Sequence, residues 1–280
     1  HTRCLSDWSS DVCSSDLMNT PQTFSHSGTT GDTFCSLVAA KLLGGGEFYL
    51  KLHNLENVIK EKLGWSMSST DRHAGRMSEK DFEMMRELML HQPYISDFKI
   101  WNGEHIDYEL ENAALHLDME ERPRNFSNQH AKAQGLDLQY YQRQLQAMPW
   151  MECREERKFP GRPIVIFRGP HYQDGNELVS PIWKDMIDKG LCEQAVYVGL
   201  ESEHAWFEET FKCFVPHYRT PDFMELARVI QGSELFVSSM SSPSALALCL
   251  GKTMWLETRK NEKWERHEYN YPMRINIRYF

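Results

Sequence analysis

Short apolar runs alternate with amphipathic stretches between Thr23 and Leu256, and this alternation constrains the fold more than any other feature of the chain. Apolar runs separated by helical patterns predict βαβ units, in which successive strands run parallel. A parallel sheet is normally covered by helices on both faces. We therefore predict an α/β protein with mainly parallel sheets.

The first half of the chain predicts one set of such units. The expected strands are 23–27, 47–51 and 95–101, and the expected helices are 32–43, 55–63, 78–90, 128–133 and 138–147. Ser78 is a suitable N-cap for its helix, because its hydroxyl can accept a hydrogen bond from a first-turn N–H group. Glu79 and Asp81 place carboxylates where the helix dipole favours them.

A charged stretch with Pro160, Gly161 and Pro163 separates this set from a second one and predicts an interdomain linker over 152–163. The expected strands beyond it are 163–167, 195–199, 234–238 and 253–256, and the expected helices are 181–189, 203–211, 220–230 and 243–250, with Thr220 and Pro221 starting the third. We expect two domains, 18–158 and 159–280. The tail after Arg259 gives no assignment.

The first seventeen residues match no element of this pattern. They contain neither a basic start nor an apolar core and are not a signal peptide. They resemble translated sequencing adapter, a contaminant of metagenomic reading frames. We expect the natural chain to begin at Met18 and the leader 1–17 to be dispensable for stability.

The composition argues against several functions. The formal net charge of −9, without a basic block, does not suit nonspecific binding of nucleic acid. No stretch approaches the roughly 18 apolar residues that predict a transmembrane segment. The seven cysteines form no CxxC pair and the twelve histidines no HExxH motif. We expect reduced cysteines, a cytoplasmic location, no cofactor and no metal site; neither His116 with Asp118 nor His204 with Glu208 has further ligands at metal spacing.

Three turns between a strand and a helix carry residues that suit ligand binding at the carboxyl ends of parallel strands. The first ends in Gly28, Thr29, Thr30, Gly31 and Asp32, where small residues let backbone amides approach a ligand and Asp32 starts the helix with a carboxylate. The turn lacks the motif of a P-loop or of a dinucleotide site. A purely structural role, as turn glycines and a helix-terminal carboxylate, is also consistent with it.

The other two turns belong to the second half. Arg168 follows a strand and could pair with a diphosphate in a bidentate way, or could lie solvated at a domain edge. Ser239, Ser241 and Ser242 lie between a strand and a helix, where hydroxyls and amides can hold a phosphate without a metal. Serines also cap helices for structural reasons, but their clustering at this point favours a phosphate site.

Together these turns resemble the family 9 glycosyltransferases of the heptosyltransferase type. The resemblance covers 24–256 and is stronger in the second half, where 234–251 (ELFVSSMSSPSALALCLG) is similar to the strand, loop and helix that hold the donor. It implies the GT-B architecture, with two facing Rossmann-like domains. Asp32 then corresponds to the proposed general base and Glu203 to the residue that holds the nucleotide ribose.

The resemblance implies transfer of a sugar from a nucleotide-diphospho-sugar to a hydroxyl of a glycan or other acceptor, with inversion at the anomeric carbon and without a metal. Arg168, Ser241 and Ser242 would stabilise the leaving diphosphate, and loops within 103–146 would contact the acceptor. The chain has Met240-Ser241-Ser242 and Ala245 where the family has Asp-Thr-Gly and, three residues later, His. A catalytically silent nucleotide- or glycan-binding protein and a nucleotide-sugar epimerase therefore stay open as alternatives.

Overall fold

The computed structural model describes residues 21–52, 77–111, 126–147, 149–170, 181–257 and 277–279. These residues form two parallel sheets, one of four strands in the order β3-β2-β1-β4 and one of six in the order β10-β9-β8-β5-β6-β7. Each strand pair in the described ranges is parallel. The predicted fold class is confirmed. No described helix is long and apolar enough to cross a bilayer.

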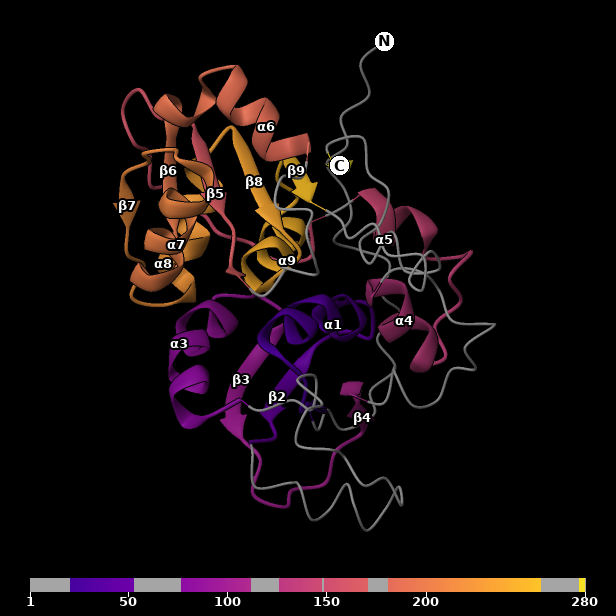
Figure 1. Cartoon of the computed structure of the whole chain (residues 1–280). Coiled ribbons are helices and arrows are strands. Elements are labelled where there is room, and N and C mark those ends of the chain that lie inside the picture. Colours follow the sequence, from indigo (N-terminus) through magenta and orange to yellow (C-terminus); the bar gives the residue numbers. More distant parts are fainter. Residues whose placement is uncertain are drawn as a thin grey trace, which may run out of the picture.

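The first sheet, with α1, α3 and α4, lies in the lower half of Figure 1, and α5 is drawn higher, to the right of α9. The elements are β1 (Gln22–His26), α1 (Thr30–Leu42), β2 (Gly46–Leu50), α3 (Glu79–Leu90), β3 (Ile95–Ile100), β4 (Tyr108–Glu109), α4 (Phe126–Ala133) and α5 (Gln142–Ala147). Ser78 caps α3 as predicted, because its hydroxyl accepts from the N–H of Asp81 while that carboxylate accepts from the N–H of Ser78. The predicted helix 55–63 lies outside the described residues.

The second sheet lies in the upper half of Figure 1. The elements are β5 (Ile164–Phe167), α6 (Pro181–Asp188), the 3₁₀ turn η4 (Leu191–Gln194), β6 (Ala195–Val198), α7 (Glu201–Phe211), β7 (His217–Tyr218), α8 (Phe223–Gly232), β8 (Leu235–Ser239), α9 (Ser242–Cys249), β9 (Met254–Glu257) and β10 (Ile277–Tyr279). The predicted start of α8 at Thr220 and Pro221 is wrong. Asp222 is the N-cap, because its carboxylate accepts from the N–H of Glu225 at 2.7 Å.

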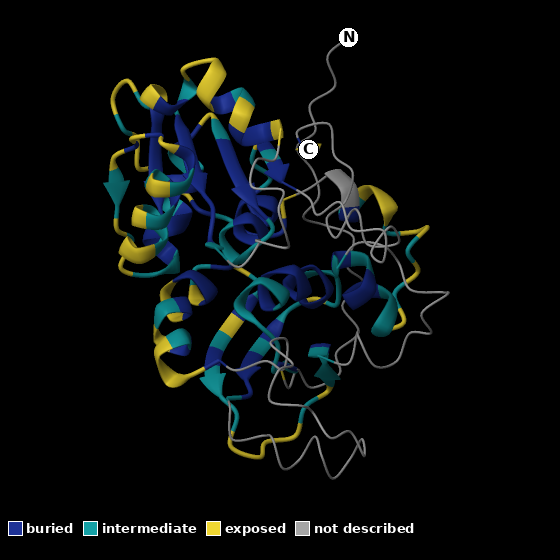
Figure 2. Cartoon of the chain, viewed as in Figure 1, coloured by how far each residue is buried: buried dark blue, intermediate teal, exposed yellow. Residues whose placement is uncertain are grey.

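Alternation along β5 separates two apolar cores. Ile164 and Ile166 pack in a cluster with side chains of α6 and α7. Val165 and Phe167 belong to a larger cluster that includes α8 and α9 and continues into the first domain through α1, α3 and α4. Figure 2 shows buried residues extending from β8 through α9 to α1. The two sheets therefore share one continuous core.

Trp150 fastens the two domains together at this shared core. Its indole N–H donates to the carbonyl oxygen of Phe34 in α1 at 3.1 Å, and its backbone N–H donates to the carbonyl of Cys249 in α9 at 3.1 Å. The Trp150 carbonyl in turn accepts from the hydroxyl of Tyr94 at 2.6 Å. Because Trp150 is 1% exposed, these hydrogen bonds are shielded from water and fix α1 beside α9.

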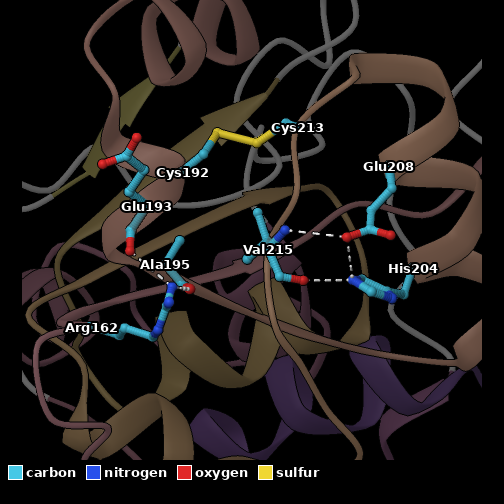
Figure 3. The surroundings of a disulfide bond; sticks show 8 residues. All are labelled: Arg162, Cys192, Glu193, Ala195, His204, Glu208, Cys213 and Val215. Carbon is cyan, nitrogen blue, oxygen red and sulfur yellow. Dashed lines mark hydrogen bonds and ion pairs between the residues drawn. A yellow bond between two sulfur atoms is a disulfide. The ribbon is translucent and has the colours of Figure 1, made fainter.

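Cys192 and Cys213 form a disulfide (Figure 3), which contradicts the expectation of reduced cysteines. Cys192 lies in η4 and Cys213 follows α7. The two cysteines are 21 positions apart in sequence, and the chain between them folds back across β6. The spacing resembles no short motif, and only the packing of α6 and α7 on one face of the sheet brings the two sulfurs together. Cys35, Cys153 and Cys249 are buried and form no disulfide within the described residues.

The disulfide should stabilise the second domain, because closing a loop of this length removes conformational freedom from the unfolded chain. We expect reduction, or the Cys192→Ala/Cys213→Ala double variant, to lower the free energy of unfolding by about 3 kcal/mol. Urea denaturation with and without dithiothreitol measures this. The double variant serves as the control, since reductant should leave its midpoint unchanged; equal wild-type midpoints in both conditions would contradict the assignment.

Candidate active site

Helices α1 and α9 lie side by side at the boundary between the domains (Figure 1), and their N-terminal turns are in contact. A Cβ atom added to Gly31 in α1 would lie 3.5 Å from the Cα of Ser242 and 3.6 Å from the Cβ of Ala245 in α9. At the other end of both helices, Pro149 accepts from the Lys41 ammonium through its carbonyl and lies next to Gly251. The two helices therefore run in the same direction, with both N-termini at one end.

The turn before α9 is a network of serine hydroxyls. Ser241 is the N-cap and exchanges hydrogen bonds with Ser244, whose hydroxyl accepts from the Ser241 N–H at 2.7 Å. Neither the N–H nor the hydroxyl of Ser242 has a partner within the part of the chain that the structure describes. Ser239 is 1% exposed and its hydroxyl also lacks a partner there. Two of the three predicted serines thus keep hydrogen-bonding capacity.

The predicted base, Asp32, lies in the first turn of α1 and is half-buried. The hydroxyl of Thr29 donates to its carboxylate at 2.9 Å and accepts from its N–H at 3.4 Å. Thr29 is therefore the N-cap of α1 and orients the Asp32 side chain. Gly28 donates from its N–H to Nδ1 of His26 at 2.8 Å, and a Cβ atom at Gly28 would collide with the His26 ring. The turn accordingly requires a residue without a side chain at this position.

Arg168 is buried in an ion pair with Glu257, at the ends of β5 and β9. Its Nε donates to Oε2 of Glu257 at 2.9 Å and its Nη2 to Oε1 at 3.2 Å. The guanidinium also lies 5.0 Å from the ring centre of Trp206, and Trp183 donates to the same carboxylate at 3.0 Å. Of the two readings of Arg168, a solvated arginine is wrong because the residue is 4% exposed. Its contact with a diphosphate stays a prediction.

Glu203 lies in the first turn of α7, where its carboxylate accepts from the N–H of Leu200 at 2.9 Å. Gly199 precedes this turn with a φ of +138°, and a Cβ there would lie 3.0 Å from Glu203 Oε2. The carboxylate therefore stabilises the start of α7 at the carboxyl end of β6. Its second oxygen leaves capacity for a further donor.

A polar cluster at the carboxyl ends of β1, β2 and β4 was missed in the sequence. Lys51 is 7% exposed and its ammonium lies 2.9 Å from Glu109 and 2.5 Å from Glu111, and the Ser25 hydroxyl donates to Glu111 at 3.1 Å. Burial lowers the pKa of Lys51, but the two carboxylates outweigh this, so that the pKa is raised overall. The sequence feature that could have indicated this cluster is the position of Lys51, a charged residue directly after an apolar strand.

His26 lies next to the first turn and is 2% exposed. Because the Gly28 N–H can only donate, Nδ1 of His26 must be the acceptor, and a neutral ring then carries its proton on Nε2. Nε2 has no partner in the described residues. Burial, followed by the charges of His130 and Lys51, holds the pKa of His26 well below 6.5. His26 is thus a neutral donor beside the turn that carries Asp32.

Comparisons with known proteins support one fold. No protein-family model matches the chain, and no curated protein sequence does. A family 9 glycosyltransferase from Veillonella parvula DSM 2008 has a TM-score of 0.53 at 8% identity, over 94% of this chain and 86% of its own. The ADP-heptose LPS heptosyltransferase II of E. coli has a TM-score of 0.50 at 12% identity, over 92% and 90%. The heptosyltransferase WaaC of E. coli with ADP has a TM-score of 0.51 at 10% identity, and the match covers 92% of each chain.

These similarities define the class of fold. The chain has the GT-B architecture of two facing α/β domains, and the resemblance to family 9 glycosyltransferases is confirmed for the fold. At such low identity the match concerns the backbone and not the activity. Within the described ranges, no three His, Cys, Asp or Glu side chains are grouped so that they could hold a metal ion.

The lowered pKa of His26 predicts a pH dependence of stability. Below about pH 6.5 the His26 ring is protonated in the unfolded chain but stays neutral in the folded protein. The free energy of unfolding should therefore decrease as the pH is lowered, by at most about 1.4 kcal/mol per pH unit from this residue. We expect the loss of unfolding free energy between pH 7.5 and 5 to be smaller in His26→Gln, measured in urea. His105→Gln is the control, because that side chain is 88% exposed; identical slopes for His26→Gln and the wild type would refute the account.

Proposed function

We propose that the protein is a glycosyltransferase that moves a sugar from a nucleotide-diphospho-sugar to an acceptor hydroxyl, without a metal and with inversion. The observation that carries the proposal is the parallel packing of α1 and α9, which brings Gly31 of one domain against Ser242 of the other. The N-termini of α1 and α9, which are the positive ends of the helix dipoles, then lie close together. An anion bound between them would offset their mutual repulsion. A diphosphate has this charge and bridges the two domains.

In this proposal 159–280 holds the donor and 18–158 the acceptor. The diphosphate would accept hydrogen bonds from Ser242 and from the hydroxyl of Ser239, which stabilise the charge of the leaving group. The Ser241 hydroxyl donates to the Ser239 carbonyl at 3.0 Å and would have to rotate away from it to reach the diphosphate. Glu203 would hold the ribose with the carboxylate oxygen that is left after the cap to Leu200. Arg168 would contact the diphosphate only if its guanidinium turned away from Glu257, so this contact stays a prediction.

Asp32 is the proposed general base. Its carboxylate would remove the proton from the acceptor hydroxyl as that oxygen attacks the anomeric carbon, and the bond to the nucleoside diphosphate would break in the same displacement. One displacement inverts the configuration. The hydroxyl of Thr29 holds the carboxylate in place at 2.9 Å, and Gly28, Thr30 and Gly31 would keep the turn narrow enough for the acceptor to approach.

A silent nucleotide-binding protein is the second candidate, favoured by Met240 and Ala245 at the donor turn. Ala245 packs against Gly31 in the interface between the two helices, where a larger polar side chain would have no room without a shift. A cytoplasmic location stays a prediction, and the disulfide removes the cysteine argument that led to it. The nature of the sugar, hexose or heptose, is likewise left to the donor screen that follows.

Asp32→Asn separates transfer from binding. The amide keeps the oxygen that the Thr29 hydroxyl donates to, so the fold should persist, while loss of the base should lower the transfer rate roughly 100- to 10,000-fold. Transfer is measured with ADP-, UDP- and GDP-sugars, and nucleotide affinity by calorimetry, which should barely change. Glu79→Gln, a first-turn carboxylate of α3, is the control. Full transfer by Asp32→Asn would show that the base is misassigned; nucleotide binding by a wild type that transfers nothing would favour the silent protein.

Glu203→Ala tests the ribose contact. Loss of a hydrogen bond to a charged group should weaken nucleotide binding by about 1.5 to 3 kcal/mol, and loss of the cap should cost about 1 kcal/mol of stability. Calorimetry gives the first value and urea denaturation the second. Glu201→Ala removes an exposed carboxylate from the same turn and should change neither; unchanged affinity in Glu203→Ala would remove this residue from the site.

A further inference from the structure

A pocket of about 430 Å³ lies in the first domain between α4 and α5. The described residues that line it are Asn128, Leu138, Gln139, Gln142 and Leu145. Its volume falls within the range of roughly 300 to 1,000 Å³ that is usual for small-molecule sites. Helix α4 packs directly against α1, which carries Asp32 at its first turn. The pocket therefore belongs to the side of the molecule that would hold the acceptor.

The chemistry of the described lining is uncharged. Each amide of Gln139, Gln142 and Asn128 combines two N–H donors with a carbonyl acceptor. A sugar hydroxyl also both donates and accepts, so amides can satisfy neighbouring hydroxyls in either direction. Leu145 is 1% exposed and Leu138 is half-buried, and these two side chains offer apolar contact to the C–H face of a ring. Phosphate or carboxylate groups are instead bound by Arg or Lys, which the described lining lacks.

Two polar atoms on the same helices still lack a partner. Ser127 is 1% exposed and its hydroxyl makes no hydrogen bond in the described residues, and the same holds for the buried Oε1 atom of Gln144. Ser127 is next in sequence to Asn128, and Gln144 is next to Leu145. Buried polar groups are normally satisfied. Neither atom has surface that an occupant of the pocket could contact, so the polar character of the pocket rests on the amides that line it.

We propose that this pocket binds an uncharged sugar unit of the acceptor. That the bound sugar belongs to the acceptor rests on the proposed function. Binding of a neutral saccharide in the pocket can be tested without sugar transfer. It assigns Gln139 and Gln142 as the residues that select hydroxyls over charged groups. Both side chains are exposed on the surface, so their replacement should leave the fold intact.

Saturation-transfer NMR with lactose, maltose and cellobiose as neutral probes, and 3′-sulfated lactose as the anionic one, tests the pocket on the full chain. We expect a signal for at least one neutral disaccharide, a weaker one for sulfated lactose, and a roughly tenfold or greater loss of affinity in Gln139→Ala/Gln142→Ala, since two neutral hydrogen bonds disappear. Arg143→Ala is the control, because Arg143 is exposed on α5 and is not among the lining residues; it should bind as the wild type does.

Binding of ADP, followed by thermal shift on the same variants, keeps the two proposals apart. If the double variant binds ADP and neutral disaccharide as the wild type does, the pocket assignment is overturned while the proposed function stands. If ADP stabilises no variant but the neutral probe binds the wild type and not the double variant, the pocket stands without the glycosyltransferase. Absence of a signal from all three neutral probes, or stronger binding of sulfated lactose, also overturns the assignment.

Discussion

The parallel contact between α1 and α9 is the interaction on which the rest of the structure depends. Each helix starts at the carboxyl end of a central strand, β1 or β8, so the contact sets where the two sheets present their ligand-binding edges. Side-by-side helices with the same direction repel each other electrostatically. Apolar burial along α9 and the hydrogen bonds of Trp150 to Phe34 and Cys249 compensate for this repulsion.

The second domain is held rigid around its strand ends by buried polar contacts. Arg168 and Glu257 form a bidentate pair across the end of β8, where Ser239 pairs with Glu257 in the sheet. Such a pair adds little net stability, because burial costs both charges their hydration, but loss of one partner would leave the other uncompensated. We infer that it serves to fix the geometry of the three strand ends beside the serine turn.

The sequence predicted the fold where local patterns decide it. The short apolar runs located β1, β5 and β8 to within a residue or two. A strand that is buried on both faces of a sheet needs such a continuous run of apolar residues. It missed β4 and β7, which are two residues long and contain Tyr108 and His217. These strands form only because a neighbouring strand offers its edge. It also missed the disulfide, since the meeting of Cys192 and Cys213 depends on packing far from either residue.

The candidate site divides in the same way. The turns at Asp32, Glu203 and Ser241 were recognisable because helix starts have a local signature. The buried pairing of Arg168 and the cluster around Lys51 were not, because each joins residues that are far apart in sequence. Local hydrogen bonds with Thr29 and Leu200 also give Asp32 and Glu203 a role at the starts of their helices. For Asp32 the sequence had left such a structural role open beside the functional one.

A crystal structure of the protein with bound ADP tests the central claim most directly, that the paired N-termini of α1 and α9 form an anion site. The account predicts the diphosphate within hydrogen-bonding distance of the Ser242 N–H, with the ribose toward Glu203. A nucleotide bound elsewhere, away from the first turns of α1 and α9, would contradict it.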